Sequence, residues 1–153
     1  MSFEKVKAYF ENTPCADKIL VLEKSSATVQ LAAEALQTEP DMIAKTMSFL
    51  IHDEPAVIVV SGESRIDNRK FKDTFACKAR MIPFDQVEQM IGHAPGGVCP
   101  FAVNEGVKVY LDISLKKYET VYPAAGSGSS AVRMTIEELE AYSHMLSWVD
   151  VCR

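Results

Sequence analysis

Apolar residues recur at helical spacing in several stretches of the chain. Near the N-terminus, Phe3, Val6 and Phe10 lie three or four residues apart, which predicts an amphipathic helix at residues 2–12. Thr135 and Glu138 form the pattern of a capping box, which predicts a helix running to about residue 143. We also expect helices from a cap at Ser25 or Ser26 to about Leu36, at residues 67–75, and at residues 84–91 after Pro83.

Strand-like segments separate these helices. Residues 43–51 alternate loosely between apolar and polar positions, and residues 56–60 are an unbroken apolar run. The turn-like residues 52–55 between them predict a β-hairpin. Further strands are expected at residues 19–22, 107–111, 120–122 and 145–151. Because helices and strands are mixed without strict alternation, the pattern favours an α+β fold over a doubly wound parallel sheet.

The composition is that of an ordinary globular protein. The 153 residues fit one domain spanning residues 1–153, with 48% hydrophobic and 24% charged residues. No apolar stretch approaches the roughly 20 residues that cross a bilayer, and the N-terminus lacks the layout of a signal peptide. We therefore expect a cytoplasmic protein that does not contact a membrane. The four cysteines are far apart in the sequence, which favours free thiols over a disulfide framework.

Charge is unevenly distributed along the chain. The whole chain carries a net charge of −5, which by itself disfavours nucleic acid. Residues 65–80, however, hold six basic and two acidic residues, a local net charge of +4. A basic face on an acidic protein can hold a phosphate backbone. Taken alone, the charge distribution favours a solvated helix face over a phosphate-binding face. The six basic residues are Arg65, Arg69, Lys70, Lys72, Lys78 and Arg80.

Two loop-like segments could carry chemistry. Residues 92–101 contain three glycines and two prolines, a composition that lets backbone N–H groups approach a carbonyl oxygen or an anion. Residues 122–131 are small and rich in hydroxyl groups, which suits a wall against which a substrate lies. The same compositions fit a rigid connector and a flexible hairpin loop, respectively.

Single residues offer further candidates. Lys45 is the one charged residue in the apolar segment 42–50, where it could face solvent or hold a phosphate or carboxylate. Cys99 could act as a nucleophile with His93 as its base, provided that the fold brings the two together. These two side chains are too few for a zinc site, and no phosphate-loop or dinucleotide motif is present. We therefore expect neither a metal nor a cofactor.

Four segments, in this order, resemble the YbaK/EbsC family of freestanding editing domains. They are residues 43–49, 92–101, 109–112 and 119–126. The lysine segment together with the GxxxP loop, Gly96 to Pro100, is fairly specific as a combination, and the similarity covers roughly residues 15–150. This family is related to the editing domain inserted in bacterial prolyl-tRNA synthetases.

The resemblance implies a twisted, barrel-like mixed β-sheet surrounded by helices. It also implies hydrolysis of the aminoacyl ester at the 3′ end of a mischarged tRNA, without a protein nucleophile. By residue, it implies catalytic roles for Lys45, Gly96, Gly97 and Pro100, and substrate binding by Thr46, Val98, Cys99, Ala125, Gly126 and Ser127. Together with the charge distribution, it implies tRNA binding by Arg65, Arg69, Lys70 and Lys72.

One departure from the family pattern concerns the second loop. Some branches place a hydroxyl side chain just before the loop's glycine, where this chain has Ala124 and Ala125. Ser127, Ser129 and Ser130 are the residues that could compensate. We expect Cys-tRNA(Pro) or Ala-tRNA(Pro)-like substrates, with the tRNA acceptor end and a prolyl-tRNA synthetase as partners. The alternatives are a non-catalytic binding module of the same fold and a thiol-dependent hydrolase that uses Cys99.

Overall fold

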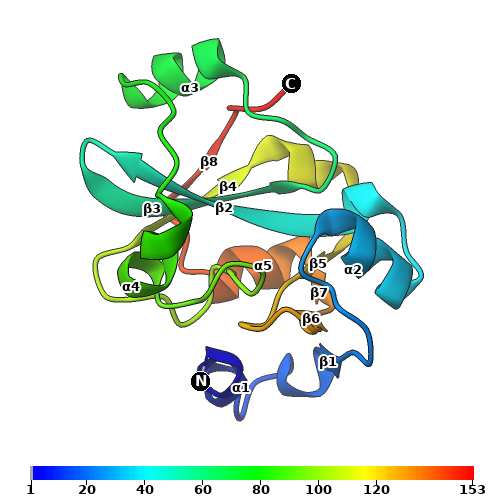
Figure 1. Cartoon of the computed structure of the whole chain (residues 1–153). Helices are drawn as coiled ribbons and strands as arrows, with labels where there is room; N and C mark the ends of the chain where they lie inside the picture. The colour runs from blue at the N-terminus through cyan, green and yellow to red at the C-terminus, as the bar shows by residue number, and fades with distance from the viewer. Residues whose placement is uncertain (1) are drawn as a thin grey trace.

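The computed structural model describes residues 2–153, and its centre is a curled six-stranded sheet (Figure 1). The strand order is β7-β5-β2-β3-β4-β8, with parallel and antiparallel pairs mixed. A separate two-stranded sheet pairs β1 with β6. The strands are β1 (Ile19–Val21), β2 (Ile43–Ile51), β3 (Glu54–Ser61), β4 (Lys108–Asp112), β5 (Thr120–Pro123), β6 (Ser130–Val132), β7 (Met134–Thr135) and β8 (Ser147–Val149).

The hairpin of β2 and β3 is the longest pairing in the sheet, and its prediction is confirmed. The antiparallel register runs without interruption from Ala44 opposite Ser61 to Ile51 opposite Glu54. His52 and Asp53 make the turn with positive φ angles of 52° and 65°. Two successive residues of this kind match the right-handed twist of the flanking strands, so a short loop closes the hairpin without splaying it.

Helices cover the sheet on both sides, as Figure 1 shows, with α3 on one side and α1 and α5 on the other. The helices are α1 (Ser2–Tyr9), α2 (Val29–Leu36), α3 (Asn68–Phe75), α4 (Val87–Ile91) and α5 (Ile136–Tyr142). One apolar cluster packs α1 and α5 against the sheet through Phe10, Phe101 and Leu139. Another packs α3 through Phe71 against Phe49 and Ile58. Since both faces are buried, β3 reads as a continuous apolar run.

The α+β architecture with a barrel-like mixed sheet is confirmed, and so is the Thr135–Glu138 capping box. The structure corrects the predicted boundaries in three places. The cap of α2 is Thr28, whose Oγ1 accepts from Leu31 N at 3.2 Å, because the chain at Ser25 and Ser26 is still occupied in contacts with Gly128 O. Residues 84–91 begin as a 3-10 helix, η3 (Phe84–Gln86), before α4.

The third correction concerns short strands. The closing strand is β8, only three residues long, instead of residues 145–151. The strands β6 and β7 were not predicted, because their two or three residues carry too little alternation to be recognised. No helix within residues 2–153 has both the length and the apolar character needed to cross a membrane.

Candidate functional site

The outer edge of β2 is incompletely paired, and this gap locates the candidate site. On that edge β5 pairs only with Ile43 and Ala44. Farther along, the backbone of Ile82 donates to Ser48 O at 3.1 Å, and Leu50 N donates to Arg80 O at 2.9 Å. Between these two contacts the edge of β2 has no strand partner within residues 2–153.

The direction of the backbone groups follows from the ladder. In an antiparallel pair, alternate residues turn their N–H and C=O groups toward the partner or away from it. Ser48 and Leu50 turn theirs away from β3, since they bond to the chain at residues 80–82. Thr46 has the same parity, so its backbone N–H and C=O also point out of the hairpin, into the gap.

A cavity of about 500 Å³ opens over this gap. Figure 1 shows α2 on one side of β2 and the segment of η3 and α4 on the other, with β5 below. Most of the lining is apolar, so a ligand that bound there would be buried mainly against apolar side chains. The lining residues are Ser26 to Val29, Ala32, Ile43 to Ser48, Met81, Ile82, Phe84, Val87, Pro95, Gly96, Val98, Tyr122, Ala124, Ser130 and Ala131.

Lys45 brings an uncompensated positive charge to the cavity. Its Nζ donates to Ser64 O at 3.1 Å, and Ser64 is itself held by a 2.5 Å hydrogen bond to the Ser61 hydroxyl. Lys45 forms no ion pair with any residue that the structure describes. Burial lowers its pKa below the ordinary lysine value, and the nearby Arg65 guanidinium contributes in the same direction. An anion in the cavity would therefore be attracted to Lys45.

Among the hydroxyl-bearing residues that line the cavity, Thr46 and Ser130 bear most on ligand binding. The Thr46 Oγ1 is buried and has no hydrogen-bond partner among residues 2–153. A buried polar atom without a partner costs about 1–3 kcal/mol, so a ligand that bonded to it would remove that cost. Ser130 lines the cavity from β6, and its hydroxyl lies 2.7 Å from the Ser127 Oγ. This bond orients Ser130, the one serine of residues 122–131 that lines the cavity.

The two predicted loops pack against each other backbone to backbone. A Cβ added at Gly97 would lie only 2.6 Å from Ser127 N, so a larger residue there would push the loops apart. Of the residues predicted for the site, Lys45, Thr46, Gly96 and Val98 line the cavity. The remaining substrate and catalytic candidates do not line the cavity; they belong to the two loops, where all but Ser127 are buried, and they are Gly97, Pro100, Cys99, Ala125, Gly126 and Ser127.

Several lining residues were not predicted from the sequence. They come from the start of α2 and from the chain before α4, and include Thr28, Met81 and Phe84. The polar signal at Thr28 was present, since threonine is a common helix cap, but Ser25 and Ser26 offered the same signal. Met81 and Phe84 were not singled out, because nothing local in the sequence distinguishes an apolar residue at a cavity rim from one in a core.

The geometry around Cys99 opposes the thiol-dependent alternative. Cys99 Sγ lies 3.5 Å from His93 Nε2, but the same nitrogen lies 2.7 Å from Phe101 O. A carbonyl oxygen only accepts, so Nε2 carries the proton and has no lone pair for the thiol. The other ring nitrogen, Nδ1, is buried without a partner among the described residues. Burial raises the pKa of Cys99 to about 12, which leaves almost no thiolate at neutral pH.

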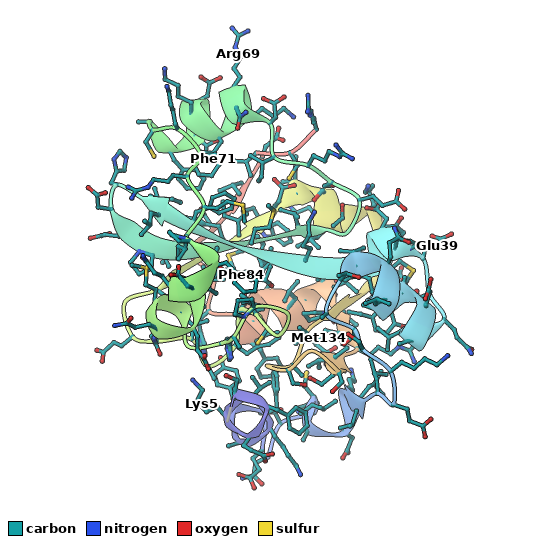
Figure 2. All side chains as sticks on the ribbon, viewed as in Figure 1. Lys5, Glu39, Arg69, Phe71, Phe84 and Met134 are labelled. Atoms are coloured by element: carbon teal, nitrogen blue, oxygen red, sulfur yellow. The ribbon has the colours of Figure 1, made fainter. Side chains whose placement is uncertain are left out.

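The part of the basic segment on α3 lies apart from the cavity. Figure 2 shows Arg69 at the outer end of α3, whereas Phe84 lies beside β2 in the middle of the molecule. Lys70 is already engaged, because its Nζ pairs with Asp150 at 3.1 Å and donates to Cys152 O at 2.9 Å. Arg69 and Lys72 are exposed on α3, and Arg65 lies close enough to Lys45 to affect its pKa. No cluster of three or more metal-ligating side chains occurs in residues 2–153.

The sequence is similar to a family model and to known proteins. The family model of the aminoacyl-tRNA editing domain matches residues 23–142. The chain is 42% identical to the uncharacterized protein YwhH of Bacillus subtilis (strain 168), over 100% of the chain and 98% of that protein. It is 29% identical to the proline–tRNA ligase of Halalkalibacterium halodurans over 76% of the chain. That match spans 20% of the ligase, so it concerns one part of a much longer enzyme.

A solved structure shares the whole fold. It is the crystal structure of a protein proposed as a trans-editing enzyme for prolyl-tRNA synthetase, and it matches with a TM-score of 0.87. The two chains are 28% identical, and the match covers 99% of the chain and 97% of that protein. The elements that surround the cavity therefore belong to a fold shared by both proteins.

The burial of Cys99 predicts that its thiol resists alkylation in the folded protein. Iodoacetamide reacts with the thiolate, and Cys99 is fully buried with a pKa of about 12. Peptide mass spectrometry should find Cys99 unmodified under conditions that label the partly exposed Cys77. In urea all four cysteines should be labelled. Labelling of Cys99 in the folded protein as fast as Cys77 would revive the thiol-dependent alternative.

Proposed function

The chain belongs to the aminoacyl-tRNA editing domain family, and from this we propose that it is a trans-acting deacylase that hydrolyses the ester of a mischarged tRNA. The observation that carries the proposal is that two features line the same apolar cavity. They are Lys45, whose charge no acidic side chain among residues 2–153 neutralises, and the part of the β2 edge that has no strand partner there. Lys45 would hold the phosphate of the terminal nucleotide, and the edge of β2 would hold the aminoacyl group.

The reaction needs little chemistry from the protein. A water oxygen attacks the ester carbonyl, the bond to the ribose oxygen breaks, and the products are the free amino acid and the uncharged tRNA. Backbone N–H groups would stabilise the oxyanion that forms on attack. The N–H of Gly97 is already bonded to Ala94 O at 3.0 Å, which leaves those of Gly96 and Val98 for this role. The outward-pointing groups of Thr46 would hold the amino acid backbone.

A separate deacylase is useful because synthetases cannot reject every smaller amino acid. One methylene in a pocket discriminates by only about 1–3 kcal/mol, so some tRNA is mischarged and a second site must remove the error. We propose Cys-tRNA(Pro) or Ala-tRNA(Pro)-like substrates and a prolyl-tRNA synthetase as a partner. Similarity to bacterial proline–tRNA ligases supports this choice. Ser130 would supply the hydroxyl group missing at Ala124 and Ala125.

A binding module without catalysis is the remaining alternative. The Thr46 hydroxyl, which no described residue bonds, and the charge of Lys45 would serve ligand binding as well as hydrolysis. The two functions separate in an assay of mischarged tRNA, since a binding module would protect the ester or leave its spontaneous hydrolysis unchanged.

Replacing Lys45 with alanine should abolish deacylation and leave the fold intact. Within the described residues the lysine side chain bonds only to a backbone carbonyl, so its loss should shift thermal melting by a few degrees at most. We expect kcat/KM to fall by at least about 100-fold, the effect of losing one charged hydrogen bond of about 3 kcal/mol to the substrate phosphate. Lys108→Ala is the matched control, because Lys108 lies on β4 and pairs with Glu54. Full activity in Lys45→Ala would remove Lys45 from the site.

Thr46→Val tests whether the side-chain hydroxyl of Thr46 contacts the substrate. Valine keeps the shape of threonine but lacks the hydroxyl, and that hydroxyl has no partner to lose within the described chain. Stability in urea should therefore stay the same or rise by up to about 1 kcal/mol. Deacylation should fall roughly 10-fold, since one hydrogen bond of about 1 kcal/mol or more to the substrate is lost. Equal activity of Thr46→Val and the unchanged protein would count against this contact.

The predicted role of Arg65, Arg69, Lys70 and Lys72 in tRNA binding needs a test that spares the fold. Because Lys70 ties α3 to the C-terminus, we choose the exposed pair Arg69→Glu and Lys72→Glu. The double variant should deacylate tRNA more slowly at low salt, with a weaker salt dependence, because phosphate contacts release counterions. Hydrolysis of a minimal aminoacyl-nucleotide should be unaffected. Lys7→Glu on α1 is the control, and a double variant no slower than Lys7→Glu would show that tRNA docks elsewhere.

A further inference from the structure

Phe84 is far more exposed to solvent than any other phenylalanine of the chain. Its side chain is 80% exposed, whereas the other six phenylalanines are buried or half-buried. Met81, three residues earlier, is 56% exposed. Both residues line the rim of the cavity that holds Lys45 and Thr46. Two exposed large apolar side chains on the rim of one cavity indicate a binding surface, whereas exposed apolar residues scattered singly need no such explanation.

The chain around Phe84 is anchored, so the exposure of the ring does not come from a loose loop. Ile82 and Val87, on either side of it, are buried in the apolar cluster that α4 makes with the sheet. Met81 forms a β-bridge with Phe49. Pro83, with a φ of −53°, starts the 3-10 helix in which Phe84 is the first residue. The backbone is thus held on both sides of a ring that faces outward, which is the arrangement of a preformed platform.

We propose that Phe84, together with Met81, stacks the terminal nucleobase of the tRNA while the aminoacyl group occupies the cavity. This inference rests on the proposed deacylase function, which supplies the occupant. In that substrate the base and the ester are attached to the same ribose, so the base must lie within one sugar of the cavity. Lys45 provides the charge complementary to the adjoining phosphate. Phe84 and Met81 are the exposed large apolar residues on the cavity wall within the described chain.

Stacking suits this position energetically. A base stacked on an aromatic ring contributes about 1–3 kcal/mol, and every base has a face that can stack. The thioether of Met81 is polarizable and adapts to an aromatic ligand. The platform would bind every tRNA alike, because its contact is with the terminal base and not with the amino acid. Selection among amino acids would then be left to the cavity floor at β2.

The experiment uses an uncharged acceptor-stem RNA hairpin whose 3′-terminal adenosine is labelled with ¹³C. Stacking on Phe84 should move the adenine H2 and H8 resonances upfield through the ring current of the phenyl group. In Phe84→Ala this shift should disappear and the Kd should rise on the order of 10-fold, within the range of one lost stacking contact. Phe84→Tyr should restore both. Leu146→Ala is the matched control, because Leu146 is 61% exposed but does not line the cavity.

The outcomes separate this inference from the function on which it rests. Upfield shifts that depend on Phe84, in a protein that hydrolyses no mischarged tRNA, would uphold the stacking platform and refute the deacylase. Deacylation by a protein whose adenine shifts are the same in Phe84→Ala would refute the platform and leave the deacylase standing. Absence of RNA binding by the unchanged protein, or a loss in Leu146→Ala as large as in Phe84→Ala, would also overturn the platform. If Leu146→Ala loses as much as Phe84→Ala, the exposed apolar residues form a general contact surface, for example for a synthetase.

Discussion

The structure of the site depends on the strand pairing of β2, which is complete on one edge and interrupted on the other. β3 pairs with β2 along its length, while β5 and the chain at residues 80–82 bond only to its two ends. Buried backbone N–H and C=O groups almost always have partners, because an unmade hydrogen bond costs as much as a lost one. A gap in the ladder inside an apolar cavity is therefore a place where water or a ligand must complete the pairing. Thr46 lies in the middle of that gap and adds a hydroxyl that has no hydrogen-bond partner among residues 2–153.

The other parts of the site are arranged around this interrupted edge of β2. The backbone contact of Gly97 with the loop at Ser127 brings the two loops close enough to close one side of the cavity. The turn after β3 presents the Ser64 carbonyl to Lys45, which places the ammonium group without neutralising it. On the opposite side, Phe84 is held outward between two anchored residues. Positive charge, hydrogen-bonding edge and aromatic surface thus lie around one cavity, the set of groups that a charged aminoacyl-nucleotide would need.

Local patterns in the sequence were enough for much of the fold and for part of the site. The hairpin of β2 and β3 and the capping box of α5 were predictable, because each depends on residues within a few positions of one another. Lys45 stood out as a lone charge in an apolar segment, and the structure places it on the cavity wall. The strands β6 and β7 were not predictable, since they are too short to show alternation and depend on partners far away in sequence.

The rest of the site could not be read from local sequence for a related reason. Which apolar residue faces a core and which faces a cavity depends on where β5 stops and α2 begins in space, so Met81 and Phe84 were missed. Conversely, Cys99 and Ala125 belong to the family motif but are fully buried, because a motif also records the residues that shape a loop from behind. The same burial explains why Cys99, although close to His93, lacks the properties of a nucleophile.

The central claim is that the cavity over the edge of β2 hydrolyses aminoacyl esters, and a time course of deacylation tests it most directly. Purified protein should be incubated with a panel of mischarged tRNAs that includes Ala-tRNA(Pro) and Cys-tRNA(Pro), with correctly charged Pro-tRNA(Pro) as reference. Our account predicts that at least one ester with a small amino acid is hydrolysed well above its spontaneous rate, while Pro-tRNA(Pro) is spared. Hydrolysis of every ester in the panel at its spontaneous rate would contradict the account.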